Sequence, residues 1–169
     1  MNLHKLLLER DATGKPLRVG LIGAGKFGSM FLAQARRTRG LHVLGVADLD
    51  PARARASLAN VGWPAEQINA RSASEAVERG TTWVGDDARA LIAHPALDVV
   101  IDATGHPAAG IAHALAAIQH GKHVVMVNVE ADVLAGPLLA AKARKAGVVY
   151  SLTYGDQPKP RAMRCSRSS

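Results

Sequence analysis

The chain of 169 residues contains few aromatic side chains and a single cysteine. Phe, Trp and Tyr make up only 4% of the residues, so we expect small aliphatic side chains to fill one core. Cys165 can form no disulfide within the chain, which is typical of a reducing compartment. No apolar run is long enough to span a membrane, and the N-terminal stretch is too short and too charged for a signal peptide. The sequence therefore predicts a cytoplasmic protein without a membrane partner.

Acidic residues are absent from the last part of the sequence. Residues 159–169 carry four basic side chains, so they supply +4 of the formal net charge of +7 and leave +3 (7 − 4) for the remainder. Elsewhere the basic residues are interleaved with acidic ones, and no basic face with aromatic side chains is indicated, so we expect no nucleic-acid partner. We predict that residues 159–169 are a basic disordered tail produced by a truncation or a frameshift, rather than a working basic arm.

Apolar runs followed by turns and alanine-rich stretches recur along the chain. Continuous Val, Ile and Leu runs are typical of parallel strands that are covered by helices on both faces. The expected strands are residues 17–22, 42–48, 81–84, 97–104, 122–129 and 148–154. The expected helices are residues 26–39, which Gly40 ends, and residues 51–60, 72–80, 107–120 and 132–145. This alternation predicts an α/β fold, a Rossmann-type doubly wound parallel sheet of about six strands with helices on both faces, over residues 17–158. An N-terminal helix and lead-in are expected in residues 1–16.

Residues 23–28 read GAGKFG, which has the G-x-G-x-x-G spacing directly after an apolar strand and at the start of a helix. Gly23 would permit the sharp turn, Gly25 would let the backbone approach a pyrophosphate, and Gly28 would let the helix pack closely on the strand. The free N–H groups and the helix dipole, about half a positive charge, would then face the phosphates. The predicted phosphate-binding residues are Gly23, Ala24, Gly25, Lys26, Phe27 and Gly28.

An acidic residue, Asp48, lies 20 residues beyond Gly28 (48 − 28), at the end of the second expected strand. A carboxylate there can accept hydrogen bonds from both hydroxyls of the adenosine ribose, which favours NAD over the 2′-phosphate of NADP. Arg53 and Arg55 could bind that phosphate instead, so NADP stays possible. The structural alternative is a set of turn glycines with an aspartate that caps the helix beginning at Pro51. Because strand, glycines, helix and acid all agree with the motif, we favour a nicotinamide dinucleotide cofactor.

Polar residues follow the fourth expected strand, at the edge of an open α/β sheet where ligands bind. The Thr104 hydroxyl could bond to a ribose or a phosphate, and Gly105 would let the chain pass close to the cofactor. The equally weighted alternative is a strand-to-helix turn in which Thr104 or His106 caps the helix at residue 107.

The fifth expected strand closes with Asn128 and Glu130. Asn128 could hold the nicotinamide ribose or carboxamide, and Glu130 could take part in substrate binding or proton transfer, although both could instead cap the next helix. His106 can titrate near neutrality, but a surface or capping role is favoured for it. The catalytic residue therefore stays unknown, with Glu130 and His106 as weak candidates. His113 and His120 could share a helix face without any further ligand, so no metal site is expected.

With these residues the chain resembles the NAD(P)-binding domain of the homoserine dehydrogenase-like oxidoreductases, most closely the bacterial branch with a C-terminal SAF domain. The resemblance covers about residues 14–158, in the stretches GKPLRVGLIGAGKFGSMF, GVADLDPARA, DVVIDATGHPAAGIAHALAAI, GKHVVMVNVEADVLAGPLLA and YSLTYGDQP. It implies a dinucleotide on Gly23, Gly25, Gly28 and Asp48, with the ATG turn near the nicotinamide. It also implies an NAD(P)-dependent oxidoreductase that acts on a small hydroxy or carbonyl substrate.

One position departs from the pattern of homoserine dehydrogenases, in which an Asn-Lys pair follows the fifth strand and the lysine is implicated in catalysis. Here Asn128 is followed by Val129, so homoserine is not the expected substrate. The resemblance also implies that YGDQP leads into a missing substrate domain, so we expect this chain alone to be inactive. A homodimer is possible, because the edge left by that domain would expose apolar surface. The alternative function is a non-catalytic NAD(H)-binding sensor or regulatory module.

Overall fold

The computed structural model describes residues 3–153. Its strands are β1 (Leu17–Ile22), β2 (Leu41–Ala47), β3 (Trp83–Gly85), β4 (Val99–Asp102), β5 (His123–Met126) and β6 (Tyr150–Leu152). Its α-helices are α1 (Leu3–Ala12), α2 (Lys26–Ala35), α3 (Pro51–Asn60), α4 (Ala73–Arg79), α5 (Ala88–Ala93), α6 (Pro107–Gln119) and α7 (Val129–Lys145), with a short 3₁₀ helix at Ala65–Gln67. Within these residues no helix is both long and apolar enough to cross a membrane.

The six strands form one sheet in the order β3-β2-β1-β4-β5-β6. All the neighbouring strands pair in parallel. Strand β1 lies in the middle of the sheet. Strands β2 and β3 extend the sheet on one side of β1, and β4, β5 and β6 extend it on the other side. The direction of winding therefore changes between β1 and β4, which is the place where ligands bind in sheets of this kind. The predicted Rossmann-type doubly wound sheet is confirmed.

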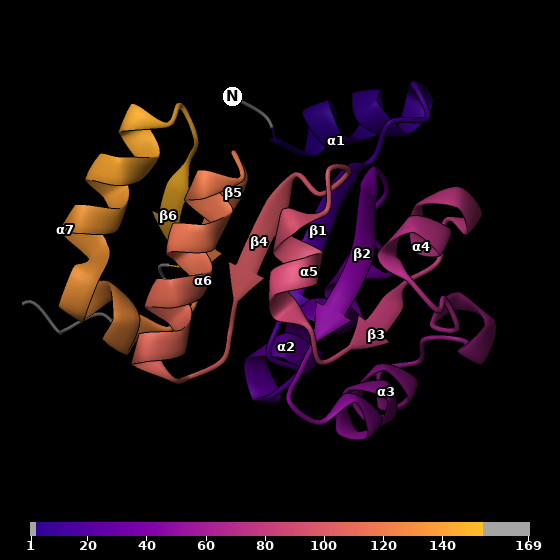
Figure 1. Cartoon of the computed structure of the whole chain (residues 1–169). Helices are drawn as coiled ribbons and strands as arrows, with labels where there is room; N and C mark the ends of the chain where they lie inside the picture. The colour runs from indigo at the N-terminus through magenta and orange to yellow at the C-terminus, as the bar shows by residue number, and fades with distance from the viewer. Residues whose placement is uncertain (1–2, 154–169) are drawn as a thin grey trace, which may run out of the picture.

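Helices cover both faces of the sheet, with α5, α6 and α7 in front of it and α2 behind it in Figure 1. On the first face Leu91 of α5 and Leu139 of α7 are buried in one apolar cluster. On the other face Leu32 of α2 and Leu58 of α3 are buried in a second cluster. Small aliphatic side chains dominate both clusters, as the scarcity of aromatic residues predicts. Helix α1 lies at the end of the sheet where β1 begins (Figure 1).

The largest difference from a predicted boundary in the first half of the chain is the end of the helix that follows β1. Helix α2 ends at Ala35 rather than at residue 39, because tight turns follow it, in which the Thr38 amide donates to the Ala35 carbonyl at 3.0 Å. The prediction that Gly40 ends this helix is therefore wrong. Gly40 has a φ of +77° and turns the chain into β2, and a Cβ there would meet the Leu7 carbonyl oxygen of α1.

The fifth strand and the helix after it also differ from the prediction. The strand ends at Met126 rather than at residue 129, and α7 begins at Val129 rather than at residue 132. The physical reason is the Asn128 side chain, whose Oδ1 accepts the Ala131 amide at 3.0 Å and thereby starts the helix earlier. The structure adds α5, which the sequence interpretation did not assign, and Asp87 caps it. The predicted tail at residues 159–169, the YGDQP exit and Cys165 lie outside the described residues.

Candidate functional site

A cavity of about 560 Å³ lies where the C-terminal ends of β1, β2 and β4 meet. Its lining residues come from the ends of β1 and β2, from the turns after β1, β2, β3 and β4, and from the first halves of α3, α5 and α6. The volume is within the range of small-molecule sites, about 300–1,000 Å³. We call this space the strand-end cavity. It coincides with the place where the winding of the sheet changes direction, so the fold and the cavity indicate the same ligand position.

The three glycines after β1 differ in backbone conformation and in what an added Cβ would meet. Gly23 has a φ of +93°, and a Cβ there would lie 2.7 Å from the Ala103 carbonyl oxygen. A Cβ at Gly28 would meet the carbonyl oxygen of Gly23, so the start of α2 could not stay so close to the loop. Gly25 has an ordinary φ of −69°, and a Cβ there would meet nothing within 4 Å. Among residues 3–153, a Cβ would therefore clash with neighbouring backbone at the first and third positions, whereas the second position has open space beside it.

Gly25 is also the N-cap of α2, and no side chain caps this helix end. The first N–H groups of a helix have no partner within the helix, so here they stay available to an anion. An open glycine and an uncapped helix end offer free N–H donors and room for an anion, so the residues present fit the pyrophosphate of a dinucleotide. Of the other predicted loop residues, Lys26 is exposed, whereas Phe27 is half-buried against the core that α2 and α3 share.

Asp48, only 7% exposed, ties the end of β2 to the glycine loop. Its Oδ2 accepts the Ala24 amide at 2.7 Å, and its Oδ1 accepts the Asp50 amide at 2.9 Å and the Arg53 guanidinium at 2.8 Å. Burial acts to raise the pKa of Asp48, but these hydrogen bonds and the Arg53 charge outweigh it, and the pKa lies below its ordinary value. A carboxylate can accept about four hydrogen bonds, so Oδ2 keeps one acceptor position. The helix-capping role belongs to Asp50, whose Oδ1 accepts the Arg53 amide at 3.0 Å.

We expect Asp48 to make the stability of the domain pH-dependent in acid. Its folded pKa is lowered, so its stabilising contribution is present above the ordinary unfolded value of 3.8 and is lost as the pH falls through the folded pKa. Urea unfolding at about pH 5 and at successive values below about pH 4 should show a steeper loss of unfolding free energy for wild type than for Asp48→Asn. Equal pH slopes for the two proteins would contradict this contribution.

The two arginines that were considered for a 2′-phosphate have different positions. The Arg53 guanidinium lines the strand-end cavity, and its side chain is 62% exposed. The Arg55 guanidinium instead donates to the Ile68 carbonyl at 2.7 Å and to the Val84 carbonyl at 3.0 Å. Arg55 therefore holds the turn before α4 to β3, and only Arg53 is placed to meet a ligand in the cavity.

A hydrogen-bonded cluster that the sequence interpretation missed lies under the turn after β4. Asp102 is completely buried, and its Oδ1 accepts the Thr104 hydroxyl at 2.9 Å and the Thr104 amide at 3.3 Å. The Asp102 Oδ2 lies 2.7 Å from Nδ1 of His113, which lines the cavity from α6. The signal in the sequence was an acid inside an otherwise apolar strand. Thr104 lines the cavity, and Gly105 follows it with a φ of +67°.

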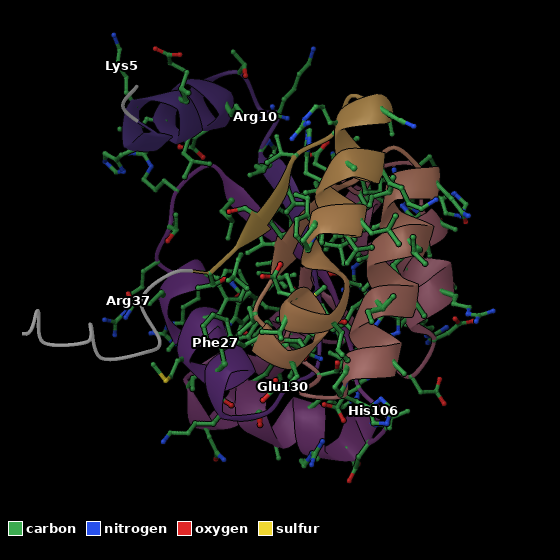
Figure 2. All side chains as sticks on the ribbon, turned by 90° about the vertical axis from the view of Figure 1, so that its left-hand side faces the viewer. Lys5, Arg10, Phe27, Arg37, His106 and Glu130 are labelled. Atoms are coloured by element: carbon green, nitrogen blue, oxygen red, sulfur yellow. The ribbon has the colours of Figure 1, made fainter. Side chains whose placement is uncertain are left out.

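Three predicted site residues lie at the N-terminal ends of helices, namely Asn128, Glu130 and His106. Both polar groups of Asn128, which is 3% exposed, are engaged: Oδ1 caps α7, and Nδ2 lies 3.4 Å from the Thr104 hydroxyl. His106 caps α6 through Nδ1, which accepts the Ala109 amide at 3.3 Å, and the same residue lines the cavity. Glu130 is exposed in the first turn of α7, and Figure 2 places Glu130 and His106 at the same end of the molecule. Their catalytic roles stay predictions. Residues 3–153 contain no group of three or more side chains that could hold a metal ion.

Comparison with known proteins gives matches over most of the described chain. The family model described as "Homoserine dehydrogenase, NAD binding domain" matches residues 19–152. A homoserine dehydrogenase from Pseudomonas aeruginosa is 30% identical over 137 residues, which are 81% of this chain and 29% of that protein. This chain thus spans less than a third of that curated relative.

Two solved structures give similar results. An NAD binding oxidoreductase from Klebsiella pneumoniae is 27% identical with a TM-score of 0.61, over 82% of this chain and 34% of that one. The biliverdin reductase of Synechocystis, solved with biliverdin and NADP+, is 26% identical with a TM-score of 0.58, over 81% of this chain and 37% of that one.

Proposed function

Because the chain belongs to the family of homoserine dehydrogenase NAD-binding domains, we propose that it holds the dinucleotide along the strand-end cavity as part of an oxidoreductase that acts on a small hydroxy or carbonyl substrate. The observation that carries this proposal is Gly25. It lies at an uncapped helix end, and no atom of the described part of the chain lies within 4 Å of the place that a Cβ would take there. The alternative of a non-catalytic regulatory module is not favoured, since the relatives are oxidoreductases.

In this proposal each group of residues has one task. Gly23, whose amide donates to the Ala47 carbonyl at 2.8 Å, shapes the turn, and the N–H groups at Gly25 and Gly28 bind the pyrophosphate. The remaining acceptor position of Asp48 binds a hydroxyl of the adenosine ribose. Thr104 and Gly105 lie beside the continuation of the cofactor across the sheet. A bound nicotinamide supplies hydride transfer to or from the substrate carbon, and the chain supplies binding and orientation.

We further propose that the preferred cofactor is NAD. The ionised Asp48 carboxylate at the end of β2 disfavours a second negative charge at the ribose, whereas Arg53 partly offsets it. Quenching of the chain's own fluorescence by NADH and NADPH measures both affinities. We expect NADH to bind more tightly, and Arg53→Ala to widen the difference about tenfold, because a charge-assisted bond to the 2′-phosphate is lost. Arg37→Ala, an exposed arginine after α2 that does not line the cavity, is the control (Figure 2). An unchanged ratio in Arg53→Ala would refute this role.

The substrate-binding side chains are proposed to lie in a further domain, so residues 1–169 alone should bind dinucleotide without turning over substrate. A homodimer stays a prediction. Val133, Leu134 and Leu138 of α7 are exposed by 76%, 71% and 57%, and such a group of apolar side chains on one helix is typical of surfaces that contact another domain or chain. The lone cysteine supports the proposal of a cytoplasmic location.

A further inference from the structure

The contact between Asp102 and His113 lies at the inner side of the strand-end cavity. Burying a carboxylate is costly unless its oxygens are hydrogen-bonded, and the side chain of Asp102 is 0% exposed. Thr104 donates twice to Oδ1, so only Oδ2 is left to meet His113. The whole arrangement thus fixes one particular orientation of the His113 ring.

The Asp102 carboxylate also determines which ring nitrogen of His113 carries the proton. An ionised carboxylate only accepts hydrogen bonds, so the His113 nitrogen that lies 2.7 Å from it, Nδ1, carries the hydrogen. In a neutral imidazole the other nitrogen, Nε2, then has a lone pair and acts as an acceptor. His113 lines the cavity with a side chain that is 18% exposed, and no hydrogen bond joins its Nε2 to any residue of the described chain.

The remaining lining of the cavity suits a flat, uncharged ring with outward-pointing donors. Ala88 and Ala109 contribute small apolar surfaces, and Leu49 is 97% exposed at the rim. Asp86 and Asp87 add further acceptors at the turn after β3, and Arg89 also lines the cavity. A purine base of the bound dinucleotide is a ring of this kind.

We infer that His113 Nε2 accepts a hydrogen bond from the 6-amino group of the adenine base, and that the Asp102–His113 pair thereby selects a 6-aminopurine dinucleotide over a 6-oxopurine one. The inference rests on the proposed function, because it concerns the same cavity. Adenine presents an N–H donor at position 6, whereas hypoxanthine presents a carbonyl oxygen. That oxygen would face the Nε2 lone pair and leave both acceptors without a donor, which should weaken binding about tenfold.

The test compares NADH with reduced nicotinamide hypoxanthine dinucleotide in fluorescence titrations of the full chain at about pH 8. Wild type should bind NADH about tenfold more tightly than the 6-oxo analogue. His113→Phe keeps a planar ring but has no acceptor, so its two affinities should agree within about twofold. His120→Phe, an exposed histidine at the far end of the same helix, should keep the wild-type preference.

Asp102→Asn provides a second variant with a distinctive readout. The two donors of Thr104 hold the asparagine carbonyl oxygen on their side, so the NH₂ group faces His113 Nδ1. The imidazole proton then moves to Nε2, which becomes a donor, and the preference should invert toward the 6-oxo analogue. A merely structural role of the pair would weaken both ligands equally.

Three results would overturn the inference while leaving the proposed function intact. They are equal binding of the two dinucleotides by wild type, a preference for NADH that persists in His113→Phe, and an unchanged direction of preference in Asp102→Asn. The wild-type comparison does not depend on whether a variant folds. Failure of wild type to bind either dinucleotide would overturn the proposed function, and the inference with it.

Discussion

Replacing Gly25 by valine is expected to lower the affinity for NADH at least about a hundredfold while changing the free energy of unfolding by about 1 kcal/mol or less. The φ of −69° at Gly25 is ordinary for valine, its ψ of −159° lies about 20° beyond the edge of the extended region, and the added side chain enters open space. The same side chain would occupy the place where the pyrophosphate approaches the helix end. Loss of two hydrogen bonds to a charged group accounts for an effect of this size.

The measurement combines a titration with NADH and urea unfolding of the same protein. Met30→Val, on the same helix at a side chain that is 61% exposed, places a β-branched residue in α2 away from the cavity and should leave both quantities nearly unchanged. Wild-type affinity in Gly25→Val would contradict the assignment of the phosphate position. A large loss of stability would instead mean that the protein itself requires this glycine.

Replacing Gly28 by alanine is expected to lower the free energy of unfolding by about 3 kcal/mol, which corresponds to a fall in Tm of about 10 °C for a domain of this size. The new Cβ would meet the carbonyl oxygen of Gly23, which is backbone and cannot rotate away, and would lie 3.3 Å from Cδ2 of Leu21. Either the loop or the start of α2 has to move, so NADH binding should also weaken.

Gly25→Ala is the matched control, because it adds the same methyl group three residues earlier on the same loop. It should unfold at nearly the wild-type temperature and yet bind NADH poorly. If calorimetry gave the two alanine variants the same Tm, the close approach of α2 to the Gly23 carbonyl would not be a determinant of stability.

The fold was largely predictable because its signals are local. The bounds of β1 and α3 agree with the apolar run and with the proline and aspartate that begin the helix. The glycine loop and Asp48 were predictable as a set, since each has a defined place in the strand-turn-helix unit. Where two local signals competed, the prediction was less accurate. Asn128 suits the end of a strand and the start of a helix equally well, and only its hydrogen bond to Ala131 decides.

The contacts inside the candidate site were not predictable in the same way. His113 meets Asp102 because α6 packs across β4, and that geometry depends on the whole sheet. Arg53 and Arg55 lie two residues apart on α3 and have the same chemistry, yet one guanidinium lines the cavity and the other binds backbone carbonyls. The sequence carries the residue types, whereas the direction of each side chain is determined by packing with elements that are distant along the chain.

The pairing of β1 with β4 has a consequence for how the protein folds. It joins Val19 to Val99, 80 residues apart (99 − 19), whereas the neighbouring pairs on either side join strands that are much closer along the chain. Closing that long loop carries an entropic cost and should occur late in folding. The strand-end cavity lies at the ends of this pair of strands, so a chain in which β1 and β4 are not yet paired has no complete binding site. A dinucleotide held there would bind only the closed sheet, and by mass action it would keep the two halves together.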